Sequence, residues 1–300
     1  MKAAKDLRRP TLIVADPRLE DHWKKISLKD LPKSAANGEV LILSYPDDEG
    51  VRLNRGRPGA DRGPERIVHY LGRAIYQGSS TPDVFLLSDQ FKQDSLNARH
   101  EAAEKTVLQM LQAGFRVITL GGGHDYGFPD ASAYFQACRG TILNVDAHLD
   151  VRPVAEGKLK SGTPFFRFVE RFGGKHLVEW GIQEQCNALL HVQYAFQNKI
   201  KVASYREPMP KIRGPVGLSI CLDAFQGIRG VSAPAVVGLV TDQGVATVEH
   251  YARESRWLGV YECAPIYDPQ NEDSARFGAL LAYRFIHTES VGKKYESHFL

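Results

Sequence analysis

The stretch NVDAHLD, residues 144–150, places three metal-binding side chains within five positions. Asp146, His148 and Asp150 stand at every second residue, directly after the apolar run TIL. Imidazole nitrogens and carboxylate oxygens are common ligands of divalent cations, and alternate residues of an extended chain point to one side. Taken alone, the stretch is equally compatible with a solvated turn whose carboxylates cap a helix. It indicates a metal site only if other segments supply further ligands.

Three more apolar runs end in groups of the same chemical kind. His124 follows FRVITL within GGGHDYG, Cys221 and Asp223 end VGLSICLD, and Glu262 follows WLGVY. Each group also has a structural interpretation: a lone histidine is usually structural, a cysteine in an apolar strand is usually a core residue, and GGGHDYG lacks the spacing of nucleotide-binding loops. We expect the four strand ends to share one rim, because parallel α/β sheets bind ligands at their carboxyl ends. Acids clustered there need a cation to offset their desolvation.

Apolar runs that alternate with helical patterns predict how these groups are positioned. Amphipathic helices are predicted at 96–114, starting at Asn97, and at 272–289, starting at Asp273. The alternation predicts an α/β fold, a three-layer α/β/α sandwich with a mainly parallel central sheet. With no repeat or linker to divide the chain, we expect a single domain over residues 1–300. The predicted strands are 39–45, 83–88, 115–120, 140–146, 176–182, 200–205, 216–223 and 257–265.

Composition narrows the classes of partner. A net charge of +3 over 300 residues, with no long basic run, gives no indication of nucleic-acid or membrane-surface binding, so we expect a small-molecule substrate. The N-terminal apolar run TLIVA is too short for a signal peptide or a membrane span. The four cysteines are far apart and form no CxxC pair. This usage favours a reducing, cytoplasmic location.

A series of motifs resembles the ureohydrolase superfamily of arginase, agmatinase and formimidoylglutamase. The motifs follow the superfamily's order from about residue 40 to 290, and the wording of GVRLNRGRPGA and SGTPF is most similar to the formimidoylglutamase branch. The resemblance implies an arginase-like fold and a hydrolase that cleaves C–N bonds of linear amidines or guanidines. The resembling segments are EGVRLNRGRPGADRGPERIVHYL, GGGHDYG, NVDAHLDVR, SGTPFFRF, SICLDAF with GVSAPAVVGL, and GVYECAPIYD.

The resemblance also implies two Mn²⁺ ions per chain. His124, Asp146 and Asp150 would hold one ion, and Asp146, His148 and Asp223 the other, so that Asp146 bridges them. Cys221 stands where the superfamily places a second bridging aspartate. Manganese prefers oxygen ligands, whereas thiolates suit softer metals. An alternative is therefore a metal-deficient pseudoenzyme, although each ion keeps three ligands without Cys221.

The implied chemistry is hydrolysis by a metal-bridging hydroxide. Glu262 would hold the cationic nitrogen of the substrate, or be merely a salt-bridged carboxylate, and Asp150 or the bridging water would carry a proton to the leaving nitrogen. Arginase has a histidine in the loop where this chain has Phe165. We therefore do not expect an arginase-type proton relay.

Substrate choice within the superfamily rests on fewer residues. For N-formimidoyl-L-glutamate, hydrolysed to L-glutamate and formamide, the two carboxylates need cationic or hydroxyl donors. Arginase-like or agmatinase-like guanidine hydrolysis is the neighbouring alternative, and a single-metal deacylase is disfavoured because it uses a different His-rich loop. The resemblance further suggests a homo-oligomer. The candidate substrate-binding residues are Arg152, Ser161, Gly162 and Thr163, with Arg167 as another possibility.

Overall fold

The computed structural model describes residues 18–35, 38–75, 83–87 and 91–287. Within these ranges one nine-stranded sheet has the order β1-β3-β2-β4-β9-β8-β5-β6-β7, and every neighbouring pair is parallel. The strands are β1 (Trp23–Ile26), β2 (Val40–Ser44), β3 (Val84–Leu87), β4 (Arg116–Leu120), β5 (Thr141–Val145), β6 (Leu177–Ile182), β7 (Lys201–Ser204), β8 (Val216–Cys221) and β9 (Trp257–Tyr261).

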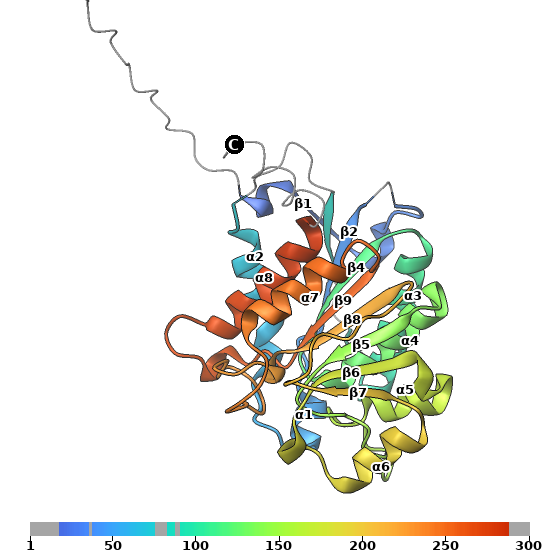
Figure 1. The fold of residues 1–300 in the computed structure, drawn as a ribbon. Coiled ribbons are helices and arrows are strands. Elements are labelled where there is room, and N and C mark those ends of the chain that lie inside the picture. Colours follow the sequence, from blue (N-terminus) through green and yellow to red (C-terminus); the bar gives the residue numbers. More distant parts are fainter. Residues whose placement is uncertain (1–17, 36–37, 76–82, 88–90, 288–300) are drawn as a thin grey trace, which may run out of the picture.

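Helices cover both faces of this sheet, which confirms the predicted three-layer α/β/α sandwich. Figure 1 shows α2, α7 and α8 on one side of the sheet and α3, α4 and α5 on the other. The helices are α1 (Glu49–Leu53), α2 (Gly63–Gly72), α3 (Leu96–Gln112), α4 (Gly127–Cys138), α5 (Pro164–Phe172), α6 (Leu189–Gln197), α7 (Thr241–Tyr251) and α8 (Asp273–His287). Of those helices, none combines the length and apolar character needed to cross a bilayer.

The protein has two hydrophobic cores, one on each face of the sheet, because its central strands are apolar on both faces. In β2, Val40 and Ile42 pack into one hydrophobic cluster, while Leu41 and Leu43 pack into the other, and all four are fully buried. Side chains alternate across a strand, so a strand covered by helices on both sides needs apolar residues at every position. The eight predicted strands are confirmed as β2 to β9, except that residue 88 of the predicted strand 83–88 lies outside the described residues. Strand β1 was not predicted. It is a partly exposed edge strand of sequence WKKI, and its two lysines interrupt any apolar run.

The two predicted helices are confirmed, with one difference at a start. Helix α8 begins at Asp273 as predicted, whereas α3 is capped by Ser95, whose side chain accepts a hydrogen bond from the backbone N–H of Ala98. Serine is a strong N-cap residue for this reason. Residues 288 and 289 of the predicted second helix lie outside the described residues. The single-domain prediction likewise extends beyond them at both ends.

The order of the central strands decides where the site lies. Strands β4, β9, β8 and β5 are consecutive neighbours. The chain reaches His124 four residues after β4, Glu262 directly after β9, Cys221 and Asp223 at the end of β8, and Asp146 directly after β5. Parallel strands present their carboxyl ends at one edge. The sheet therefore collects four distant segments of the sequence at a single rim.

Candidate metal centre

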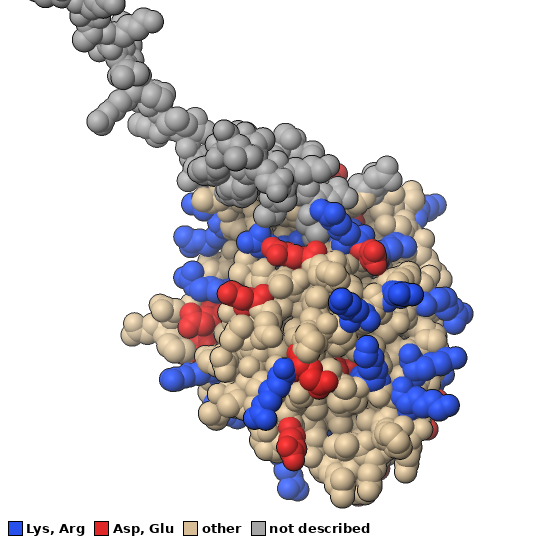
Figure 2. Space-filling view, in the orientation of Figure 1, with Lys and Arg blue, Asp and Glu red and all other residues tan. Residues whose placement is uncertain are grey.

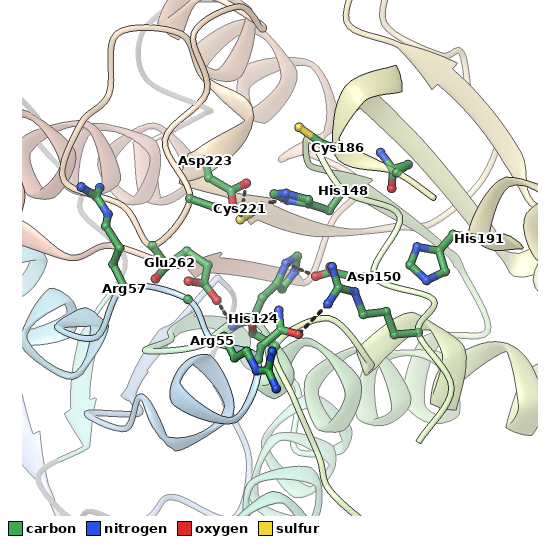
Figure 3. Close-up of a pocket in the computed structure, with 17 residues that line it drawn as sticks. Arg55, Arg57, His124, His148, Asp150, Cys186, His191, Cys221, Asp223 and Glu262 are labelled. Atoms are coloured by element: carbon green, nitrogen blue, oxygen red, sulfur yellow. Dashed lines mark hydrogen bonds and ion pairs between the residues drawn. The ribbon is translucent and has the colours of Figure 1, made fainter. Parts of the chain in front are cut away.

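The rim surrounds a cavity of about 260 Å³. Five predicted ligands, His124, His148, Asp150, Cys221 and Asp223, line it together with Glu262, and Figure 3 draws their side chains around a common centre. Asp146 is fully buried and contacts two of these residues, His124 and His148. The convergence expected from the strand order is therefore found.

His124 and Asp146 form the deepest part of the group. Nδ1 of His124 lies 2.8 Å from Oδ2 of Asp146 and 3.2 Å from Oδ2 of Asp150. Despite this proximity, neither His124 Nδ1 nor Asp146 Oδ2 has a hydrogen-bond partner of acceptable geometry, although both atoms are buried. Buried polar atoms are nearly always paired. Two unpaired electron-donating atoms directed at the same space are what a metal ion satisfies.

The surroundings of His124 fix its orientation. Nε2 lies 3.0 Å from Oγ of Ser219, which fits a tautomer with the proton on Nε2 and leaves the Nδ1 lone pair for a metal. The ring stacks on Tyr261 at 4.8 Å and meets Phe165 edge-on at 5.5 Å. Phe165 is thus a packing partner of His124.

A second group shares Asp146. Nδ1 of His148 lies 3.3 Å from Oδ1 of Asp146 and 3.4 Å from Oδ2 of Asp223. The chain here is not extended: the N–H of His148 donates to Oδ1 of Asp146, and Asp150 has a left-handed backbone with φ of 49°. A tight turn, rather than strand periodicity, brings Asp146, His148 and Asp150 to the same centre.

Cys221 lies within this centre. It is buried, and its thiol donates to Oδ1 of Asp223 at 2.9 Å. The possible ligand atoms of His124, Asp146 and Cys221 all lie within 4.8 Å of one another, as do those of Asp146, His148 and Asp223. Burial and the neighbouring acids raise the pKa of the Cys221 thiol well above its ordinary value.

The acids of the site have no lysine or arginine as counter-charge within the described residues. Burial and the charge of Asp146 raise the pKa of Asp223 to about 6. Burial opposes charge on Asp146, but the two histidines lower the pKa of its carboxyl below the ordinary value. Such a donor set of buried carboxylates and imidazoles fits divalent cations.

Glu262 sits at the inner wall of the cavity. Its Oε1 accepts from the backbone N–H of His124 at 2.8 Å, while Oε2 is buried without a hydrogen-bond partner. Burial and the nearby Asp223 raise the pKa of Glu262 to about 8. No ion pair to Glu262 occurs in the part of the chain that the structure describes, so the alternative of a salt-bridged carboxylate is wrong there. An unpaired carboxylate oxygen facing a cavity is suited to a cationic N–H donor.

The predicted substrate residues separate into two groups. Arg152 and Ser161 line the cavity, joined through Asn54: Arg152 Nη1 donates to Oδ1 of Asn54, and Asn54 Nδ2 donates to Oγ of Ser161, both at 3.1 Å. Gly162 and Thr163 are buried and do not line it. The Thr163 hydroxyl donates to the carbonyl of Lys160 at 2.8 Å and so closes a turn.

The proposed role of Arg167 in substrate binding is not supported by its position. Its guanidinium lies 3.6 Å from the ring centre of Phe128 and 3.0 Å from Nδ1 of His100, and Arg167 is not among the residues that line the cavity. The His100 ring in turn pairs with Asp125 at 2.8 Å. Helix α5 directs Arg167 into this buried network because Phe165 and Phe168 occupy its inward face.

Several cavity residues were missed by the sequence analysis. The segment LNRGRPG was quoted only for its resemblance, although four of its residues line the cavity. Cys186, Asn187 and His191 belong to the segment from β6 to α6, where no motif marks them. The missed lining residues are Asn54, Arg55, Gly56, Arg57, Cys186, Asn187, His191, Ser232 and Ala233.

Comparisons with known proteins agree with this geometry. The model of the arginase family matches residues 39–287. A formimidoylglutamase of Klebsiella pneumoniae is 30% identical over 277 residues, covering 83% of this chain and 86% of the relative, and one of Staphylococcus aureus is 27% identical over 306 residues, covering 90% and 94%. A crystal structure of Trypanosoma cruzi formiminoglutamase with Mn²⁺ superposes with a TM-score of 0.79 at 26% identity, covering 91% of this chain and 98% of the other.

Proposed function

The chain belongs to the arginase family, and from this premise we propose that it is a metal-dependent hydrolase of a linear amidine, N-formimidoyl-L-glutamate. The reaction is hydrolysis to L-glutamate and formamide. The relatives named for this activity support the choice of substrate over the guanidines of arginase and agmatinase.

The proposed metal ligands are those that face one another at the rim. His124, Asp146 and Asp150 would hold one ion, and Asp146, His148 and Asp223 the other, with Cys221 between them. The observation that carries the proposal is the pair of buried, unpaired atoms His124 Nδ1 and Asp146 Oδ2, 2.8 Å apart. The Mn²⁺ of the T. cruzi structure supports manganese as the ion.

The chain's own groups have distinct tasks in the proposed reaction. Divalent cations bound here would lower the pKa of a water molecule and so supply the nucleophile that an amidine carbon needs. Glu262 accepts an N–H of the amidinium through its free Oε2 and thereby orients the carbon. Asp150, on the cavity wall, returns a proton to the departing nitrogen of glutamate.

The substrate's carboxylates need donors farther out. Arg152 and Ser161 stand on the cavity wall and are held by Asn54. Gly162 supports them indirectly, because a Cβ there would lie 2.9 Å from Cδ of Arg152. We assign Thr163 to the turn that carries Ser161 rather than to the substrate.

The direct test is product analysis with the Mn²⁺-loaded full chain. N-formimidoyl-L-glutamate, agmatine and arginine are supplied separately, and formamide, ammonia and urea are measured. We expect formamide and glutamate in equal amounts from the first substrate and no urea from the other two. Urea release without formamide would assign the protein to the guanidine hydrolases. No turnover of any amidine or guanidine by metal-loaded protein would favour the pseudoenzyme alternative.

Location and assembly follow from other features. All four cysteines are free thiols, which supports a reducing, cytoplasmic location.

Helix α6 exposes a row of apolar side chains, including Leu190 at 75% and Phe196 at 86%, and the surface over α6 in Figure 2 is tan. Large exposed apolar groups that gather on one element are typical of protein interfaces. We infer a homo-oligomer that uses this surface.

A further inference from the structure

Arg55 is a cation on the cavity wall that has no side-chain partner among the described residues. It lies in the loop after α1, it is exposed, and it lines the cavity. Throughout 18–35, 38–75, 83–87 and 91–287, no hydrogen bond or ion pair engages its guanidinium. Its backbone is left-handed, with φ of 63°, a conformation that is unfavourable for residues other than glycine. Asp150 and Glu262, which also line the cavity, have left-handed backbones too, as do four described residues elsewhere. Strained backbone often occurs at functional sites, and here it accompanies the position of Arg55 on the cavity wall.

The neighbouring Arg57 shows what a structural arginine in the same loop does. Its Nη2 donates to the carbonyl of Arg229 at 2.8 Å, and its guanidinium lies 4.1 Å from the ring centre of Tyr267. Figure 3 shows its side chain directed away from His124 and Asp150. Arg55 lacks any such anchoring, although only one residue separates the two.

Arg152 provides a second cation from a different segment, the turn after β5. One of its five N–H groups is used by Asn54, and the guanidinium is otherwise exposed to the cavity. Asn54 directly precedes Arg55, so the same short loop that carries one arginine holds the other. Acids and histidines from the strand ends line the cavity together with three arginines. The guanidinium of Arg57 is engaged by Arg229 and Tyr267, so Arg55 and Arg152 are the two that can bind a ligand.

We propose that Arg55 and Arg152 act as a pair, each binding one carboxylate of a dicarboxylate substrate. The inference rests on the proposed function and extends it by naming the residues that select the substrate. N-formimidoyl-L-glutamate has an α-carboxylate beside the amidine nitrogen and a second carboxylate at the end of its side chain. Guanidinium groups bind carboxylates through two parallel hydrogen bonds. The distal ammonium of agmatine would instead meet like charge.

The test compares N-formimidoyl-L-glutamate with two analogues, each of which lacks one of its carboxylates. N-formimidoyl-4-aminobutyrate lacks the α-carboxylate, and N-formimidoyl-2-aminobutyrate lacks the distal one. The variants are Arg55→Gly, which also removes the backbone strain, and Arg152→Gln. Arg62→Ala, on an exposed arginine outside the cavity, is the matched control. Arg55→Lys keeps the positive charge but lacks the planar guanidinium group that forms two parallel hydrogen bonds.

We expect Arg55→Gly and Arg152→Gln each to raise KM for N-formimidoyl-L-glutamate by about tenfold or more, with a smaller change in kcat. Each variant should have the same KM as the unsubstituted protein for the analogue that lacks the carboxylate bound by the replaced arginine. This analogue should be a different one for each of the two variants. Arg55→Lys should recover part of the loss. Unchanged kinetics of Arg55→Gly, or an equal loss on all three substrates, would overturn the pairing.

A binding measurement separates this inference from the proposed reaction. Glutarate carries two carboxylates and no amidine, and its binding to the Mn²⁺-loaded protein is followed by calorimetry. We expect weaker binding to Arg55→Gly than to the unsubstituted protein and Arg62→Ala, even if no formimidoyl compound is hydrolysed. Equal affinity of all three proteins for glutarate would contradict the role of Arg55 whatever the outcome of the activity assay.

Discussion

At Cys221 the chain carries a thiol among buried acids, where the related motif has a carboxylate. Replacing it by aspartate supplies a hard oxygen ligand, so Cys221→Asp should raise the affinity for Mn²⁺ and the activity. The same change adds a charge to the metal-free centre and should lower the melting temperature without metal. Calorimetric titration with Mn²⁺ measures the first effect and thermal unfolding the second.

Cys138→Ser, remote from the cavity, is the control for that substitution. It should leave both quantities unchanged. Unaltered or reduced Mn²⁺ affinity of Cys221→Asp would argue against a position of Cys221 beside the ions.

Glu262→Gln tests the assignment of the amidinium-binding group. Glutamine keeps an oxygen that can accept the N–H of His124 but removes the negative charge. We expect kcat to fall by about a hundredfold or more while Mn²⁺ content stays the same. Full activity of the variant would show that Glu262 does not hold the substrate.

The positions of the site residues follow only in part from their spacing in the sequence. The spacing of Asp146, His148 and Asp150 led to the correct group of residues, but the turn at Asp150 that unites them is not encoded in a period of two. Arg55, in the loop after α1, and His191, on α6, belong to no spacing pattern, because the packing of their segments brings them to the cavity. Residue types at strand ends were predictable, whereas contacts made by loop side chains depend on tertiary packing.

At the scale of elements, a buried carboxylate ties the helix layer to the sheet. Asp130 on α4 accepts from the hydroxyl of Tyr45, which follows β2, and from that of Tyr261 at the end of β9. Burial raises the pKa of Asp130 to about 7. Because Tyr261 stacks on His124, this contact also supports the metal centre.

The raised pKa predicts a pH dependence of stability. The folded state holds the Asp130 proton more tightly than the unfolded state, so the contribution is fully present below the ordinary carboxyl pKa and is lost as pH rises to about 7. The slope is up to about 1.4 kcal/mol per pH unit. The free energy of unfolding in urea is measured between pH 5.5 and 8.5 for the metal-free protein and for metal-free Asp130→Asn. The difference between the two proteins gives the contribution of Asp130. A difference that does not vary with pH would contradict it.

The strands were largely predictable from apolar runs, because a covered parallel sheet needs apolar side chains on both faces. The two long helices α3 and α8 were predicted from the spacing of their apolar residues, whereas α1, α4, α5, α6 and α7 were not predicted. Strand β1 was missed because pairing with β3, rather than its own composition, makes WKKI a strand. The strand order, which places β9 between β4 and β8, is a property of the assembled sheet that no single run contains.

At the scale of the whole molecule, the exposed apolar face of α6 predicts assembly. Leu190→Glu combined with Phe196→Glu places charges on that face and should lower the molecular mass measured by light scattering to that of one chain. Leu280→Glu, a comparable change on α8, should leave the mass unchanged. Identical masses for all three proteins would exclude α6 as the interface.

Two divalent cations are proposed to hold together side chains from four strand ends. The metal content of the full chain after loading with Mn²⁺ and dialysis tests this proposal, in comparison with Asp146→Asn and with Asp242→Asn, a change of an exposed acid on α7. We predict about two Mn²⁺ per chain for the unsubstituted protein and for Asp242→Asn, and less than one for Asp146→Asn, because Asp146 contributes to both groups of ligands. Absence of bound metal in the loaded protein, or equal content in all three, would contradict the account.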